Sequence, residues 1–161
     1  MGAWTIYACH QPSGAAIGIF CISERKTGGK VKGGVDFIME TIEALSTALK
    51  EMFAETYTVY IGNPGQGMEK PCLLITPLLS VQQEFLAGRV KTDTSYMIQY
   101  FPESEQDGPQ SCIQVGSRLM EELQVLETDK GKIRCTCKQY EIVDGVLQFS
   151  MNCNAVVNRP L

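Results

Sequence analysis

The chain has 161 residues, of which 44% are hydrophobic and 20% are charged, and its net charge is −4. This is ordinary usage for one globular domain, so disorder over the whole length is excluded, and the lack of a lysine or arginine block disfavours a dedicated, sequence-specific nucleic-acid binder. No apolar run approaches the roughly 20 residues that span a bilayer, and no basic segment precedes an apolar core as in a secretory signal.

Residues 1–34 differ in character from the rest of the chain. They contain the only tryptophan, Trp4, and the only histidine, His10, and they end in a glycine- and lysine-rich stretch at 26–34. Neither a helical nor a strand period persists there, which predicts a flexible N-terminal segment ahead of a domain at 35–161. Two origins stay open for this segment: a genuine N-terminal arm, or a non-native leader or tag in front of a native start near Met39.

The first regular pattern follows directly. Apolar residues recur at alternating spacings of four and three, which is the stripe of an amphipathic helix: Ile38, Ile42, Leu45, Leu49 and Met52. Asp36 is a suitable N-cap for this helix because its carboxylate can accept a hydrogen bond from a free backbone N–H of the first turn.

Two strands are expected next. Residues 57–61 are rich in β-branched and aromatic side chains, and the glycine-rich stretch 62–67 then predicts a loop. The continuous apolar run at 72–76 predicts a strand buried on both faces. Pro77 cannot donate to a ladder, so the strand should bend, stop or lie at a sheet edge there. Residues 78–86 fit neither period.

A long alternating strand begins after Gly88. One of its faces carries Val90, Thr92, Thr94, Tyr96, Ile98 and Tyr100, and the other carries Arg89, Lys91, Asp93, Ser95, Met97 and Gln99. Two interpretations stay open for Arg89, Lys91 and Asp93. They form ordinary cross-strand ion pairs, or they belong to the interface or lumen of a ring.

A second helix follows an acidic loop at 102–108. Pro109 is suited to its first turn, and Gly116 inside it indicates close packing, since glycine costs a helix about 1 kcal/mol relative to alanine. The apolar stripe of this helix is expected to comprise Cys112, Val115, Leu119, Leu123 and Leu126.

The C-terminal third predicts a β-hairpin. Asp144-Gly145 is a two-residue turn signal that places Ile142 opposite Leu147 and Tyr140 opposite Phe149. Farther from the turn, the apolar residues of the two strands face each other only if one strand contains one extra residue near 138–139. We therefore predict a β-bulge there. The bulge aligns Cys137 with Met151, Cys135 with Cys153 and Ile133 with Ala155. The other face of the last strand is polar and uncharged: Gln148, Ser150, Asn152 and Asn154.

The expected order is therefore helix, three strands, helix, two strands. Strands grouped in this way between helices predict an α+β fold, with one mixed, mostly antiparallel sheet on which both helices pack. A domain of about 120 residues is large enough to form one such hydrophobic core.

The search for catalytic chemistry yields no constellation. The only histidine is His10, so a cysteine–histidine or serine–histidine pair within the regular domain is ruled out, and no phosphate-binding glycine loop or HExxH motif occurs. Cys135 and Cys137 form a CxC without further zinc ligands, and the seven scattered cysteines are expected to be reduced and mostly buried. We therefore predict no catalytic residue, no metal site and no cofactor.

Several stretches, taken in order, resemble the small tail terminator (tail completion) proteins of phages and prophages from Gram-positive bacteria. The stretches are the opening helix with Ile42, Leu45 and Leu49, the buried strand 71–75, the central strand 86–102, and the hairpin 140–149. The resemblance covers roughly residues 36–157. It departs slightly at Ala87-Gly88-Arg89, where the family usually has a glycine-asparagine-arginine-like turn.

The resemblance implies a non-enzymatic structural protein. It implies a homo-oligomeric ring, usually a hexamer, that caps the tail tube and joins it to the head–tail connector protein. Assembly would take place in the cytoplasm of the bacterial host, and the product would be a virion tail or tail-like particle. Arg89, Lys91 and Asp93 are then candidates for the ring interface. The alternative is a monomeric α+β binding or regulatory module of similar fold.

Overall fold

The computed structural model describes residues 2–10, 16–26, 34–54, 56–63 and 66–158, with side chains described from residue 37 to residue 156 within these ranges. The elements in chain order are β1 (Gly2–His10), β2 (Ala16–Lys26), α1 (Gly34–Met52), β3 (Thr58–Ile61), β4 (Cys72–Glu84), a 3-10 turn (Leu86–Gly88), β5 (Arg89–Phe101), α2 (Gly108–Glu122), β6 (Val125–Thr128), β7 (Gly131–Val143) and β8 (Val146–Asn158).

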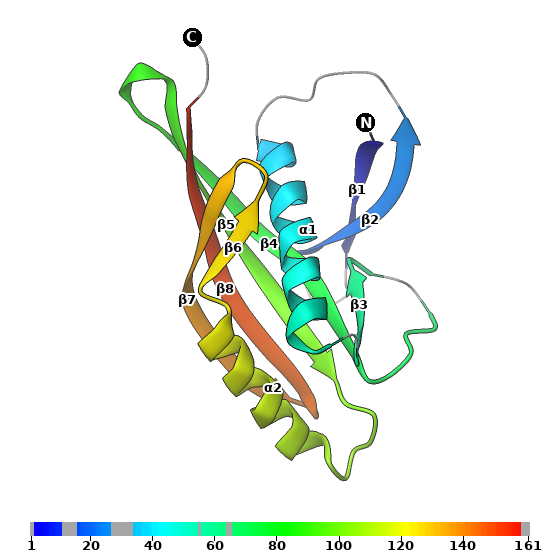
Figure 1. Ribbon diagram of the computed structural model, residues 1–161. Helices are drawn as coiled ribbons and strands as arrows, with labels where there is room; N and C mark the ends of the chain where they lie inside the picture. Colours follow the sequence, from blue (N-terminus) through cyan, green and yellow to red (C-terminus); the bar gives the residue numbers. More distant parts are fainter. Residues whose placement is uncertain (1, 11–15, 27–33, 55, 64–65, 159–161) are drawn as a thin grey trace.

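The domain is one curled six-stranded sheet with two helices on one face (Figure 1). Its strand order is β3-β4-β5-β8-β7-β6, in which β3 and β4 are parallel and all other neighbours are antiparallel. The predicted α+β class, with a mixed and mostly antiparallel sheet, is confirmed. The two N-terminal strands, β1 and β2, form a separate antiparallel pair, and β2 lies close to β4.

The hydrophobic core is built around β5, whose side chains alternate between the two faces of the sheet. Tyr96, Ile98 and Tyr100 are buried on the same face as the inward residues of β8, and the apolar stripes of α1 and α2 join them in one cluster. The hydroxyl of Tyr96 donates to the carbonyl of Ile38 across 3.4 Å, so the central strand is also tied to α1 by a hydrogen bond. Burial raises the pKa of Tyr100 to about 12.

Two cations hold the C-terminal ends of the helices. Arg118 of α2 donates to the carbonyl of Met52 across 2.6 Å, and its guanidinium lies 4.9 Å from the centre of the Phe53 ring. Lys138 of β7 donates to the carbonyl of Met120 across 2.6 Å. The last carbonyls of a helix lack partners within the helix and carry partial negative charge, so both contacts fix helix ends to neighbouring elements.

The C-terminal hairpin matches its prediction. Tyr140 pairs with Phe149, Ile142 with Leu147 and Cys135 with Cys153. Asp144 and Gly145 have φ values of 51° and 77°, the left-handed pair that a two-residue turn of this kind requires. The predicted bulge lies between Thr136 and Gln139, where Cys137 and Lys138 together oppose Met151, so Cys137 meets Met151 only as half of the bulge.

The structure differs from the sequence predictions at the end of the second helix and in β4. Leu126 was assigned to the second helix but lies in β6, because α2 ends at Glu122 and Leu126 only coincides with its helical spacing. Residues 78–84, which fitted neither period, continue β4 beyond a bulge at Leu78 next to Pro77. Leu126 is nevertheless buried, so the prediction of its burial was correct while the element was wrong.

β1 and β2 were not predicted either. The apolar run in β2 was compared with the length of a membrane span, and a short apolar run does not reveal a strand by its period alone. The predicted N-cap role of Asp36 is wrong, because α1 begins at Gly34 and Asp36 lies within its first turn. The glycine-rich stretch 27–33 lies outside the described residues. Within the part of the chain that is described, no helix is long and apolar enough to cross a membrane.

Glu40 of α1 joins the helix to the turn between β6 and β7 through an ion pair of 3.0 Å with Lys130. Partial burial opposes ionisation of the carboxyl group, but hydrogen bonds from Lys130 and Thr128 and the charge of Lys130 outweigh it, so the pKa of Glu40 lies below its ordinary value. A carboxyl whose pKa falls on folding stabilises the protein above its unfolded-state pKa, and this contribution is lost as the pH falls through the folded-state value.

We expect Glu40→Gln to lower the free energy of unfolding at pH 7 by about 1 kcal/mol or less, since Lys130 is mostly exposed. The difference from the wild type should shrink as the pH falls below about 4.5, where the wild type also loses the charge. Urea unfolding at pH 7, 5 and 3.5 measures both quantities. A difference that stays constant over this range would contradict the assignment.

Gly116 provides a second test, because a Cβ atom there would lie 3.0 Å from the ring of Tyr140. In the wild-type background, Gly116→Ala should therefore gain less than the roughly 1 kcal/mol that alanine normally adds to a helix. In a Tyr140→Ala background the full gain should appear. Equal gains in both backgrounds, measured by urea unfolding, would show that the close approach costs nothing.

Candidate interaction surface

The face of the sheet opposite the helices is the candidate site. Between the ends of its strands this face carries polar, uncharged side chains that are partly exposed: Ser95 and Gln99 of β5, Thr136 of β7, and Gln148, Ser150, Asn152 and Asn154 of β8. The predicted polar face of the last strand is confirmed. We call this surface the outer face.

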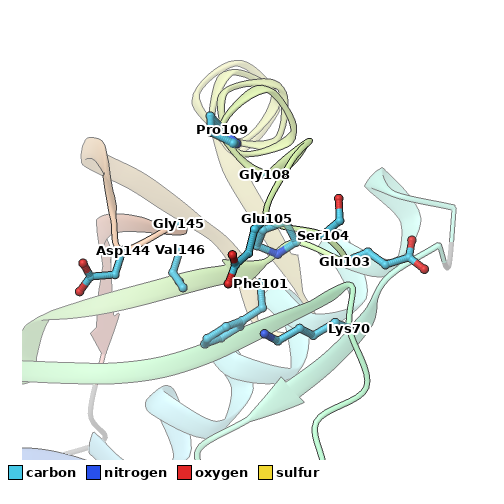
Figure 2. Close-up of a pocket in the computed structure, with 11 residues that line it drawn as sticks. Lys70, Phe101, Glu103, Ser104, Glu105, Gly108, Pro109, Asp144, Gly145 and Val146 are labelled. Carbon is cyan, nitrogen blue, oxygen red and sulfur yellow. The ribbon is translucent and has the colours of Figure 1, made fainter.

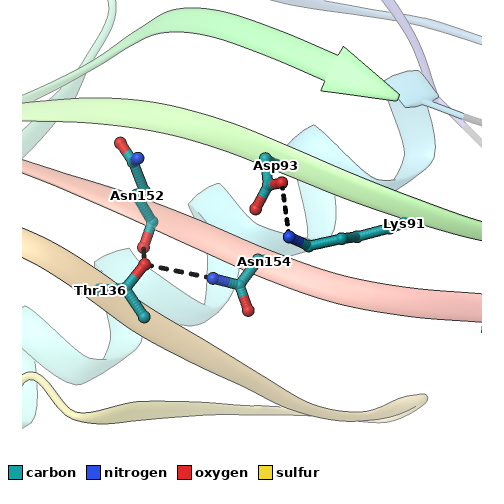
Figure 3. A network of polar contacts seen from close by, with 5 residues as sticks. All are labelled: Lys91, Asp93, Thr136, Asn152 and Asn154. Carbon is teal, nitrogen blue, oxygen red and sulfur yellow. Dashed lines mark hydrogen bonds and ion pairs between the residues drawn. The ribbon is translucent and has the colours of Figure 1, made fainter. Parts of the chain in front are cut away.

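Hydrogen bonds fix the side chains of the outer face in place (Figure 3). Ser95 donates to the side-chain carbonyl of Asn152 across 2.9 Å, and Asn154 donates to the hydroxyl of Thr136 across 3.1 Å. The Thr136 hydroxyl in turn donates to the backbone carbonyl of Asn152 across 3.4 Å. The network joins three adjacent strands, so this part of the outer face offers ordered amides and hydroxyls.

The three predicted site residues lie at one end of this face. Lys91 and Asp93 form an ion pair of 3.1 Å, and both side chains are nearly two-fifths exposed (Figure 3). They are two residues apart in β5, so the pair runs along one strand, and the expected cross-strand pairing was wrong. Arg89 begins β5, is exposed, and forms no ion pair within the described part of the chain.

At this same end, the sheet extends into an arm that was not predicted from the sequence. The arm is the distal hairpin of β4 and β5, residues 78–91, and it projects past the helices (Figure 1). Its exposed apolar side chains include Leu79 at 62% and Leu86 at 93% exposure, together with Leu78, Val81 and Phe85. Runs of apolar residues without a helical or strand period were the only sign of it in the sequence.

An open hollow of about 360 Å³ lies at the opposite end of the sheet, between the loop before α2 and the turn of the β7–β8 hairpin. Its lining includes Glu103, Glu105, Asp144 and Lys70 (Figure 2). The carboxylates of Glu103 and Asp144 point outward to opposite sides. Paired catalytic acids converge within a pocket, so Glu103 and Asp144 do not form such a pair here.

The two cysteines of the CxC motif also lie in different environments. Cys135 is buried opposite Cys153, whereas Cys137 is exposed at the bulge, so the two thiols do not converge on one ion. The hydrogen bond shared with Cys135, together with burial, raises the pKa of the Cys153 thiol. No cluster of three or more potential metal ligands occurs among the described residues. The ordered amides and hydroxyls of the outer face are groups that can form hydrogen bonds with another macromolecule.

Comparison with known proteins agrees with this interpretation. A family model described as a phage tail terminator protein matches residues 40–160, which include α1 from Glu40 onward, all of α2 and the whole six-stranded sheet. A comparison with curated proteins gives no match.

The Lys91–Asp93 pair should contribute little to the stability of a single chain, because ion pairs this exposed are typically worth about 1 kcal/mol or less. We expect Asp93→Asn to change the free energy of unfolding by less than about 1 kcal/mol, with the change shrinking in 1 M salt. Urea unfolding at low and high salt measures this, with Glu127→Gln in the exposed Lys132–Glu127 pair as a matched control. A loss above about 2 kcal/mol would mean that the pair supports the fold.

Proposed function

Because this chain belongs to the phage tail terminator family, and so is a structural protein of a phage tail or tail-like particle, we propose that it assembles into a closed ring. The ring is a homo-oligomer of six copies that caps the tail tube and joins it to the head–tail connector protein. Assembly takes place in the cytoplasm of the bacterial host. The protein has no catalytic role in this proposal.

The outer face is the observation that carries the proposal. A ring of identical subunits uses heterologous contacts, in which two different surfaces of the same chain meet. The outer face supports this because its side chains are held by hydrogen bonds, and a pre-ordered surface loses less conformational entropy on binding. Arg89, Lys91 and Asp93 belong to the ring interface in this proposal, as charged groups that set its register.

The proposal also concerns how the chain is divided. Residues 35–161 are the ring-forming domain, and residues 1–34 are an appendage that is not required for the ring. Their deletion should leave ring formation intact. The competing function, a monomeric binding or regulatory module, would use the same fold without self-association, so oligomeric state separates the two.

We expect light scattering across a range of concentrations, with and without purified tail tube, to show a closed ring in solution or at the ends of the tube. Arg89→Glu combined with Lys91→Glu should weaken ring formation at least about tenfold, because reversed charges at an interface cost affinity, while the unfolding midpoint stays nearly unchanged.

Lys50→Glu is the matched control, since it reverses one exposed charge on α1, on the side of the sheet opposite the outer face. This variant should assemble like the wild type. A wild-type chain that stays monomeric at every concentration and ignores the tube would refute the terminator function and favour the monomeric module.

A further inference from the structure

The arm and a second apolar surface at the opposite end of the sheet suggest how neighbouring copies meet. The arm places Leu79 and Val81 on the outer face, next to Ser95 and Asp93 of β5, and its tip carries Phe85 and Leu86. All four side chains are about half exposed or more. Large apolar residues gathered on one projecting hairpin are costly in water unless a partner covers them.

The second surface, which we call the ledge, consists of Ile113 of α2 with Tyr140 and Ile142 of β7. Their exposed fractions are 51%, 36% and 37%. They lie together because Gly116 of α2 approaches the Tyr140 ring, and Ile113 is one helical turn before Gly116 on the flank of the helix that faces β7. Ile142 is two residues beyond Tyr140 on the same face of β7.

The ledge and the arm lie at opposite ends of the molecule. The strand β8 begins at the turn beside the ledge and ends in register with Arg89, beside the tip of the arm (Figure 1). Their charges are also complementary. Arg89 at the arm is exposed without an ion pair, and so are the acidic Glu141 and Asp144 beside the ledge, within the described residues.

We propose that the arm of one copy of this chain docks on the ledge of the next copy. The contact covers Leu79, Val81 and Leu86 with Ile113, Tyr140 and Ile142, and it brings Arg89 of one copy towards the acidic residues of the other. The occupant is a second copy because the chain itself supplies the complementary surface, apolar against apolar and basic against acidic. This inference rests on the proposed ring, for which it names the two surfaces in contact.

The test uses two full-length variants, an arm variant, Leu86→Asp, and a ledge variant, Ile113→Asp. Each should remain monomeric where the wild type assembles, because a buried unpaired carboxylate weakens the contact at least about tenfold. Mixed in equal amounts, they should form a dimer of twice the monomer mass and nothing larger. The intact ledge of the arm variant accepts the intact arm of the ledge variant, and the two mutated surfaces terminate growth.

Val125→Asp is the matched control, since Val125 is similarly exposed but lies on β6, outside both surfaces. It should assemble like the wild type. Urea unfolding checks that all three variants are folded. This check is informative because Leu86, Ile113 and Val125 are outside the buried core.

The outcomes separate this inference from the proposed function. If the wild type forms rings and both single variants still do, the arm and ledge are not the contact, although the ring stands. If the mixture forms the dimer but the wild type yields only open chains, the contact stands and the ring is refuted. If the wild type stays monomeric and the mixture gives no dimer, both are refuted. If only the arm variant fails to bind the tail tube while rings persist, the arm contacts the tube protein instead.

Discussion

The alternation of side chains along β5 is the constraint on which the rest of the structure depends. This strand lies inside the sheet, between β4 and β8, and its inward residues Tyr96, Ile98 and Tyr100 are almost fully buried. A slip of one residue would move all of them to the outer face and bring polar residues into the core. The same alternation that directs both helices to one face therefore also leaves the other face polar, ordered and available for contact.

The arm follows from a difference in length between strands and helices. A strand of 13 residues, as in β4, β5 and β8, spans about 43 Å. The 19 residues of α1 span only about 28 Å. The helices cannot cover the full length of these strands, so one end of the sheet extends past the core. Its side chains remain exposed unless something outside the chain covers them, and several of them are large and apolar.

Sequence alone predicted the parts of the fold in which the local pattern determines the structure. The alternation after Gly88, the Asp144-Gly145 turn and the extra residue before Gln139 each specified a register that the structure confirms. Leu126 was misassigned because its spacing suits a helix as well as a strand, and the end of α2 at Glu122 depends on tertiary packing. The arm was missed for a related reason. Exposure of Leu79 and Leu86 depends on how far the sheet extends past the core, which no local pattern records. Lys91 pairs along its own strand with Asp93 because the residues directly across from it are Gln83 and Val156, which carry no charge.

The position of the apolar surfaces also limits which assemblies satisfy the chain. A two-fold dimer uses the same patch on both copies, so pairing two arms would leave both ledges exposed, and pairing two ledges would leave both arms exposed. A head-to-tail contact covers both surfaces of each copy, as does a two-fold dimer in which each arm meets the partner's ledge, but only the head-to-tail contact repeats until it closes. An open chain retains one uncovered arm and one uncovered ledge, at a cost that grows with their apolar area. A closed ring retains neither, so the same two patches that make a single copy incomplete favour closure over continued growth once the angle between neighbours permits it.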